Sequence, residues 1–134
     1  MTNGFFDSDY ISGLWERAVD TLRDAKLVIS PHSIANRSYY AAFYAVTALF
    51  ALEGVSFKKH SQLEAAVHRD LVHTERWDAR LGKNFSDLIK YRTTGDYRFN
   101  EMVSPEEAKD AIKLAFEILE AVHEAGPDIF PMPV

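Results

Sequence analysis

The segment from Tyr39 to Leu52 constrains the fold most strongly, because Thr47 is its only residue that is neither apolar nor aromatic. A helix over about Ser33–Glu53 would be apolar on nearly every side, which is typical of a helix surrounded by other helices. The run is also shorter than the roughly 18 residues that indicate a membrane span. The sequence therefore predicts a soluble helical bundle with this segment at its centre.

Helical periodicity dominates the rest of the chain as well, without strand alternation or an internal repeat. Ser30-Pro31 should end the first helix, because proline disfavours helical geometry at the residue before it. Gly54 is a natural left-handed C-cap for the second helix. We expect an all-α, up-and-down antiparallel bundle of four or five helices. The expected helices run from about Tyr10 to Ile29 with Asp7 or Ser8 as N-cap, Ser33 to Glu53, Ser61 to His73, Asp78 to Arg92 or beyond, and Pro105 to Ala125.

The last of these helices carries the clearest end signals. Ser104, Pro105 and Glu107 match the N-cap, first position and third position of a capping box. Gly126-Pro127 should stop the helix, and residues 127–134 should then form an extended arm. We expect one helical domain over residues 1–134, with its core at about 10–125.

The chain has no cysteine, which excludes disulfides, thiol nucleophiles and zinc sites with cysteine ligands. Its absence agrees with a reducing compartment. Asp7 lies near the N-terminus, where a signal peptide would carry basic residues. Both observations favour a cytoplasmic protein.

Charge is unevenly distributed along the chain. Residues 56–100 hold nine basic and six acidic side chains, whereas residues 101–134 hold two basic and eight acidic ones. The total is −5, which argues against a uniformly basic nucleic-acid binder. An anion-binding surface should therefore be sought in the middle third, although a solvated helical surface would account for the same excess.

Arg92 breaks the apolar pattern of the fourth helix. It continues the inward-facing series Leu81, Phe85 and Leu88 in helical steps, so its guanidinium should face the bundle. A buried charge needs a partner, and Asp96 lies four residues further along the same face if the helix continues. Such a pair could serve a binding site or a purely structural polar network.

Two further groups of polar residues favour an anion-binding site. Arg37 lies one turn before Tyr40 at the start of the aromatic part of the second helix. Lys58, Lys59, His60 and Ser61 bring two cations and an imidazole to the start of the third helix, where free N–H groups attract anions. The alternative is that Ser61 is simply an N-cap and the lysines are solvated.

Other motifs carry less information. Glu120 and His123 match one Glu-x-x-His element of a di-iron bundle, but the further inward carboxylates of such a site are missing, so we expect no metal site. Glu64 and His68 are expected to form a surface pair. No glycine-rich phosphate loop or nucleophile elbow is present, and no cofactor is implied.

Three ordered motifs resemble the small stand-alone members of the HEPN superfamily, the higher eukaryote and prokaryote nucleotide-binding domains. The likeness covers about residues 10–125. The motifs are Asn36-Arg37-Ser38-Tyr39-Tyr40-Ala41-Ala42-Phe43-Tyr44, Lys59-His60-Ser61, and Tyr91-Arg92-Thr93-Thr94-Gly95-Asp96-Tyr97.

This resemblance implies an antiparallel bundle that is usually dimeric and is found in toxin–antitoxin, defence and RNA-processing systems. Many such domains occur beside a small nucleotidyltransferase. Active members resemble one another in an Arg-x(4–6)-His element, in which arginine binds the scissile phosphate and histidine assists proton transfer. Arg92 matches the arginine, but Asp96 replaces the histidine and Tyr97 follows it.

We therefore expect a homodimeric binding module for a nucleotide, RNA or partner protein, with a degenerate nuclease motif. Its ligand should meet Arg37, Tyr40, Lys59, His60, Ser61, Arg92 and Tyr97. A metal-independent RNA endonuclease is the alternative, in which Arg92 clamps phosphate and His60 or Asp96 acts as acid or base. A structural protein is the third possibility.

Overall fold

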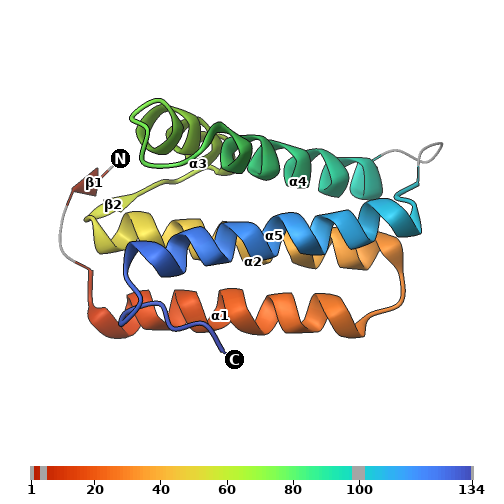
Figure 1. Ribbon diagram of the computed structural model, residues 1–134, viewed down its shortest axis with the longest axis horizontal. Coiled ribbons are helices and arrows are strands. Elements are labelled where there is room, and N and C mark those ends of the chain that lie inside the picture. The colour runs from red at the N-terminus through yellow and green to blue at the C-terminus, as the bar shows by residue number, and fades with distance from the viewer. Residues whose placement is uncertain (1, 4–5, 98–101, 134) are drawn as a thin grey trace.

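The structure is a computed structural model that describes residues 2–3, 6–97 and 102–133. Helices pack in antiparallel contacts, as the sequence predicts (Figure 1). In the described part of the chain, no helix is long and apolar enough to cross a membrane. The elements are β1 (Thr2–Asn3), α1 (Ser8–Leu27), α2 (Pro31–Leu52), β2 (Val55–Ser56), α3 (His60–Ala66), the π-helix η1 (Val67–Val72), α4 (Ala79–Tyr97) and α5 (Pro105–Ala125).

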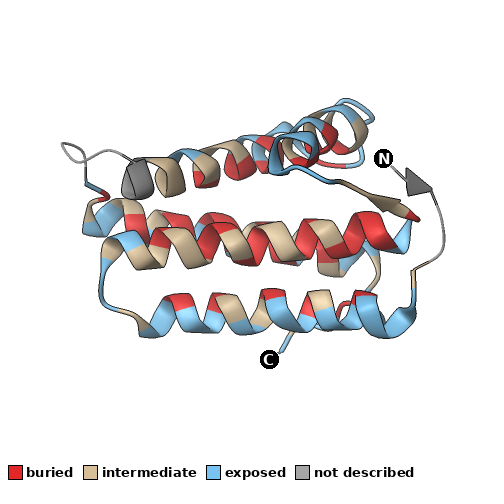
Figure 2. Cartoon of the chain, turned by 180° about the vertical axis from the view of Figure 1, so that it is seen from behind, coloured by how far each residue is buried: buried red, intermediate tan, exposed pale blue. Residues whose placement is uncertain are grey.

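Helix α2 is the centre of the bundle, as expected from its apolar composition. It packs against α1, α4 and α5, and Figure 2 shows buried residues along most of its length. Pro31 occupies its first turn, so the helix begins two residues before the expected position, at a site that proline tolerates. Gly54 follows its C-terminus with a positive φ of 79°, which glycine adopts without the strain of a side chain.

Helix α1 begins where its cap predicts but ends earlier than expected. The Asp7 carboxylate accepts a hydrogen bond from the Asp9 amide at 2.8 Å, which identifies Asp7 as the N-cap. The helix ends at Leu27, and Val28 is already extended. Its inner side buries Trp15, Ala18 and Leu22 against α2 and α5.

The third helical segment departs from the predicted α-helix. After Ala66 the chain continues as the π-helix η1 to Val72. The N-cap of α3 is Lys59 and not Ser61, because Gln62 folds back to accept hydrogen bonds from the amides of Lys58 and Lys59. Ser61 is exposed within the first turn.

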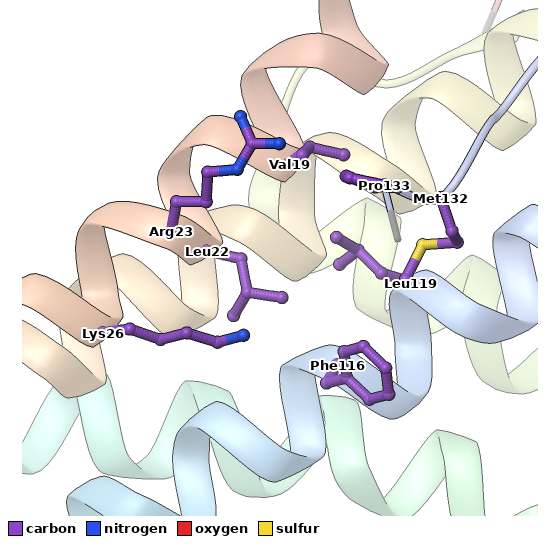
Figure 3. Close-up of a pocket in the computed structure, with 8 residues that line it drawn as sticks. All are labelled: Val19, Leu22, Arg23, Lys26, Phe116, Leu119, Met132 and Pro133. Atoms are coloured by element: carbon purple, nitrogen blue, oxygen red, sulfur yellow. The ribbon is translucent and has the colours of Figure 1, made fainter.

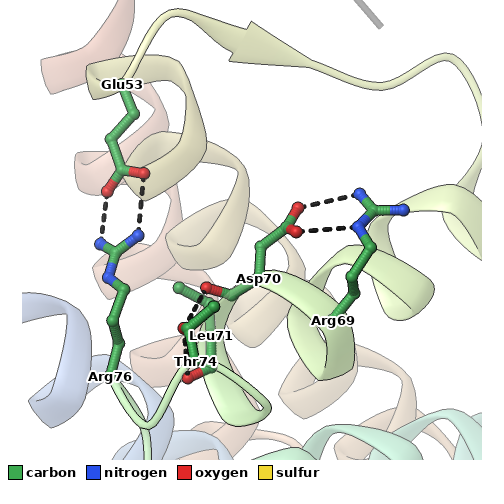
Figure 4. Close-up of polar contacts among 6 residues, drawn as sticks. All are labelled: Glu53, Arg69, Asp70, Leu71, Thr74 and Arg76. Carbon is green, nitrogen blue, oxygen red and sulfur yellow. Dashed lines mark hydrogen bonds and ion pairs between the residues drawn. The ribbon is translucent and has the colours of Figure 1, made fainter.

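Two ion pairs stabilise η1 and the turn that follows it (Figure 4). Arg76, in the turn before α4, contacts both carboxylate oxygens of Glu53 at the end of α2. Arg69 makes a similar two-pronged contact with Asp70, and the Thr74 hydroxyl donates to the Asp70 carbonyl at 2.7 Å. The turn is therefore held to α2 as well as to η1.

Helix α5 confirms the predicted capping box. Ser104 Oγ accepts from the Glu107 amide at 3.1 Å, and Glu107 accepts from the Ser104 amide at 3.0 Å. The expectation of an extended arm after Gly126 is wrong, because the chain turns back. Phe130 is fully buried, and its carbonyl accepts a hydrogen bond from His123 Nδ1 at 2.6 Å.

Candidate functional site

Arg92 brings a positive charge to the aromatic part of α2. Its side chain is half-buried on α4, and its guanidinium carbon lies 5.3 Å from the ring centres of both Tyr39 and Tyr40. At this distance the negative face of an aromatic ring attracts a cation. The two tyrosines therefore hold the guanidinium in place above α2.

His60 joins the same group from the start of α3. Its Nδ1 atom lies 2.9 Å from the hydroxyl of Tyr39, which is almost completely buried. Its ring also lies 4.3 Å from that of Phe43, measured between centres, at an angle of 32°. We call Tyr39, Tyr40, Phe43, His60 and Arg92 the Arg92 cluster; it joins α2, α3 and α4.

The electrostatics of the Arg92 cluster keep its histidine neutral. Partial burial, with the neighbouring positive charge of Arg92, lowers the pKa of His60 below its usual value. Burial raises the pKa of Tyr39 to about 12, although Arg92 opposes the shift. Near neutral pH the cluster therefore contains one arginine cation, a neutral imidazole and a protonated phenol. If the phenol donates to His60 Nδ1, the imidazole proton is on Nε2.

A cavity of about 150 Å³ adjoins the Arg92 cluster and shares Phe43 and His60 with it. The rest of its lining consists of two lysines and three other residues, so it combines apolar walls with positive charge. Arg17 from α1 lies 5.1 Å from the Tyr44 ring centre. The cavity is lined by Phe43, Thr47, Phe57, Lys58, Lys59, His60 and Leu63.

The structure brings some of the predicted site residues together, leaves others apart, and does not describe the side chains of Asp96 and Tyr97. Tyr40, His60 and Arg92 come together, and Lys59 lies beside them in the cavity wall. Arg37 is half-buried on α2, one turn from Tyr40, and within the described residues no hydrogen bond, ion pair or ring contact joins it to the cluster. Ser61 is exposed one residue beyond His60 and does not line this cavity.

Asp96 and Tyr97 belong to the helical backbone of α4, which continues through Thr93, Thr94 and Gly95 to Tyr97. This backbone places Asp96 one turn beyond Arg92. Their side chains lie outside the described residues, so the predicted ion pair between Arg92 and Asp96 stays a prediction.

Tyr39 and Phe43 were not among the ligand-binding residues that the sequence predicted. Their aromatic spacing was compatible with ordinary core packing, and Tyr39 is indeed buried. What distinguishes them is contact with His60, twenty-one residues after Tyr39 in the chain. Helical spacing does not predict a tertiary contact of this kind, although a buried tyrosine hydroxyl generally requires a hydrogen-bond partner.

Glu64 and His68 do not form the direct surface pair that was expected. Instead Ser86 on α4 lies between them: its hydroxyl donates to Glu64 at 3.0 Å and lies 2.9 Å from His68 Nε2. The serine proton points to the carboxylate and not to the imidazole, unlike the arrangement that activates a serine nucleophile. This chain of contacts ties α3 and η1 to α4.

The Glu-x-x-His element on α5 is not assembled into a larger cluster. His123 binds the Phe130 carbonyl, and Glu120 is exposed. Across residues 2–3, 6–97 and 102–133, no group of three or more histidine, aspartate or glutamate side chains could hold a metal ion.

The chain is similar to a known protein family over most of its length. Residues 11–125 match the HEPN domain family. A "UPF0332 protein" of Thermotoga maritima is 40% identical over 129 residues, which cover 92% of this chain and 96% of that protein. A protein of Methanocaldococcus jannaschii named "Putative toxin MJ0142" is 31% identical over 74 residues, or 55% of this chain and 50% of that protein. Because the family match spans most of the helical bundle, the chain belongs to the HEPN domain family.

Proposed function

We propose that this HEPN domain binds the phosphate groups of RNA or a nucleotide at the Arg92 cluster. The observation that carries the proposal is the position of the Arg92 guanidinium, 5.3 Å from two tyrosine ring centres and in the electrostatic range of His60. Aromatic contacts restrict a guanidinium, so less freedom is lost when it binds a phosphate.

The neighbouring side chains fit the rest of such a ligand. Lys58 and Lys59 in the adjoining cavity can neutralise further phosphates, and the half-buried rings of Tyr40, Phe43 and Tyr44 offer faces on which bases can stack. Arg17 adds a cation beside Tyr44. The combination of aromatic faces and cations is typical of surfaces that bind single strands without reading their sequence.

The test is the affinity of purified protein for a fluorescently labelled single-stranded RNA at several salt concentrations. Arg92→Ala should weaken binding about tenfold or more, because it removes a charge-assisted contact, and should lower the salt dependence by about one released counterion. Arg23→Ala, an exposed arginine on α1, is the matched control and should change neither quantity. Equal affinity of Arg92→Ala and the unchanged protein would contradict the proposal.

A metal-independent RNA endonuclease is the second candidate, favoured by the relative that is named a toxin and by the neutral imidazole of His60. A neutral imidazole can accept the proton of the attacking ribose 2′-hydroxyl, the imidazolium that forms can then donate it to the leaving oxygen, and Arg92 would hold the scissile phosphate. This candidate predicts RNA cleavage that persists with a metal chelator and is lost in both Arg92→Ala and His60→Gln. Intact RNA in all samples would leave binding as the function.

We also propose that the protein is a homodimer and acts beside a partner protein of the nucleotidyltransferase type in a toxin–antitoxin setting. The support is family membership and the half-buried aromatic face of α2, since an apolar surface of this kind is typical of an interface. Sedimentation at micromolar concentration should show a dimer. A monomer across the micromolar range would contradict this part of the proposal.

A further inference from the structure

A second cavity lies away from the Arg92 cluster, between α1, α5 and the C-terminal segment. Its volume is about 240 Å³, and it shares no residue with the cluster or with the cavity beside it. Figure 3 shows the lining side chains arranged around a space between the two helices. They are Val19, Leu22, Arg23, Lys26, Phe116, Leu119, Met132 and Pro133.

The floor and walls of this cavity are apolar. Leu22 and Leu119 are buried, whereas Phe116 is 38% exposed and Met132 is half-buried at the edge. An exposed phenylalanine beside a hollow leaves apolar surface in contact with water, which a ligand with an apolar body would cover.

The C-terminal wall is held by contacts of its own. The Trp15 indole donates to the Pro131 carbonyl at 2.9 Å, and Phe130 is fully buried with its ring 5.3 Å from that of Trp15, measured between centres. His123 binds the Phe130 carbonyl as well. Met132 and Pro133 are therefore positioned by neighbours before any ligand enters, which reduces the entropy lost on binding.

The polar groups at the mouth carry one sign of charge. Arg23 and Lys26 are the charged lining residues, and no acidic side chain lines the cavity. Lys26 extends toward Phe116, with its Nζ atom 5.9 Å from the ring centre (Figure 3). Arg23 is 3.5 Å from Asp20, but both side chains are more than half exposed, so this pair is weak and can be exchanged for a ligand anion.

We infer that this cavity binds a small carboxylate with an unbranched apolar tail, such as a medium-chain fatty acid. Its carboxylate would meet Lys26 and Arg23, and its tail would lie on Leu22, Leu119 and Phe116. The volume equals about eight water molecules, which suits a chain of about eight carbon atoms and is smaller than the pockets that enclose drug-sized ligands. This inference is independent of the function proposed for the Arg92 cluster.

Calorimetric titration with octanoate tests it. Saturable one-to-one binding is expected, and hexanoate should bind about fifteenfold more weakly, because each buried methylene contributes a factor of about four. Octanamide, which has the same chain without the charge, should bind roughly fivefold more weakly than octanoate. Octanoate that does not saturate the protein, or octanamide that binds equally well, would overturn the inference.

Substitutions at the cavity and away from it test where octanoate binds. Lys26→Gln should weaken octanoate roughly fivefold, whereas Lys109→Gln, an exposed lysine of α5 that does not line the cavity, should leave the affinity unchanged. Val19→Phe should fill the cavity and abolish binding while thermal melting reports whether the fold is intact. Equal loss in Lys26→Gln and Lys109→Gln would show nonspecific attraction and would overturn the site.

The fluorescence of Trp15 provides a readout that does not depend on a substitution at the cavity. In a Trp77→Phe background Trp15 is the remaining tryptophan, and it contacts the C-terminal segment next to Met132. Its emission should shift with the same midpoint as the calorimetric titration. Unchanged emission despite calorimetric binding would place the ligand elsewhere and contradict the assignment.

Discussion

At the residue scale, the function proposed for this HEPN domain depends on three side chains, Tyr39, His60 and Arg92, that come together from separate helices. The sequence predicted that Arg92 faces the bundle, because its spacing follows the apolar series of α4. It also singled out His60 as part of a basic segment. Their proximity was expected as part of one site, but helical spacing could not establish it, because it depends on how α3 is placed against α2 through the Tyr39–His60 contact.

The pKa of His60 provides a residue-scale prediction. Arg92 contributes to lowering that pKa, so Arg92→Gln should raise it toward its usual value. NMR titration of the imidazole signals measures this, with His60→Gln used to assign the resonance. His123 lies on α5, where its ring binds the Phe130 carbonyl outside the cluster, so its signals serve as a reference for the fold. An unchanged His60 pKa would mean that the two groups do not interact in solution.

The same shift fixes the direction of a pH effect. A histidine whose pKa is lowered in the fold binds fewer protons there than in the unfolded chain. Its contribution to stability is therefore complete above the unfolded pKa of about 6.5 and is lost as pH falls through the lower folded value. Urea unfolding should show that His60→Gln reduces the loss of stability between neutral and mildly acidic pH. An identical pH profile would contradict this.

At the element scale, the ends of helices were predicted best where side chains cap them. Ser104 and Glu107 form the expected capping box, and Gly54 adopts the expected positive φ. The π-helix was not predicted, because its extra residue per turn depends on packing against α4. Gly82 allows that packing: a Cβ atom there would lie 2.8 Å from Val72 Cγ2 and 3.0 Å from His68 Nδ1.

Two glycine substitutions should therefore have opposite effects. Gly82→Ala forces a stiff valine and an imidazole to move, and should destabilise the protein by about 1–2 kcal/mol. Gly13→Ala on α1 has no atom within 4 Å of the added methyl group and should stabilise by about 0.5–1 kcal/mol through helix propensity. Both variants can be compared by urea unfolding. A neutral or stabilising Gly82→Ala would indicate that α4 and η1 are more loosely packed.

The link between α2 and the turn before α4 gives a second prediction at this scale. Glu53→Gln removes the charge that Arg76 contacts, and should cost up to about 1 kcal/mol because both side chains are partly solvated. Asp20→Asn, which affects the longer and more exposed pair with Arg23, should cost less than about 0.3 kcal/mol. Equal losses of unfolding free energy in the two variants would mean that the geometry of the Glu53–Arg76 pair adds no stability.

At the scale of the whole molecule, the sequence predicted the class and antiparallel packing of the bundle, because the apolar helix over Ser33–Glu53 had to be covered on nearly every side. It did not predict that the C-terminal segment folds back and packs beside α1 and α5. Pro131 and Pro133 suggested an extended arm, and the fully buried Phe130 that precedes them carried no periodic signal. Met132 and Pro133 of this segment form part of the wall of the cavity between α1 and α5.

Phe130 should consequently be an anchor for the fold. Phe130→Ala removes a completely buried ring and is expected to cost about 3 kcal/mol, with a change in Trp15 fluorescence because the two rings are in contact. Ile129→Ala, at a neighbouring position that is 41% exposed, should change stability by less than about 0.5 kcal/mol. A small effect of Phe130→Ala would show that the C-terminal segment is not docked.

The central claim is that RNA phosphate meets Arg92 beside His60, and NMR of arginine Nε–H and histidine ring signals during RNA titration tests it most directly. The account predicts that the signals of Arg92 and His60 shift together with the binding curve, while those of Arg23 and His123 remain in place. RNA binding that leaves the Arg92 and His60 signals unmoved would contradict it.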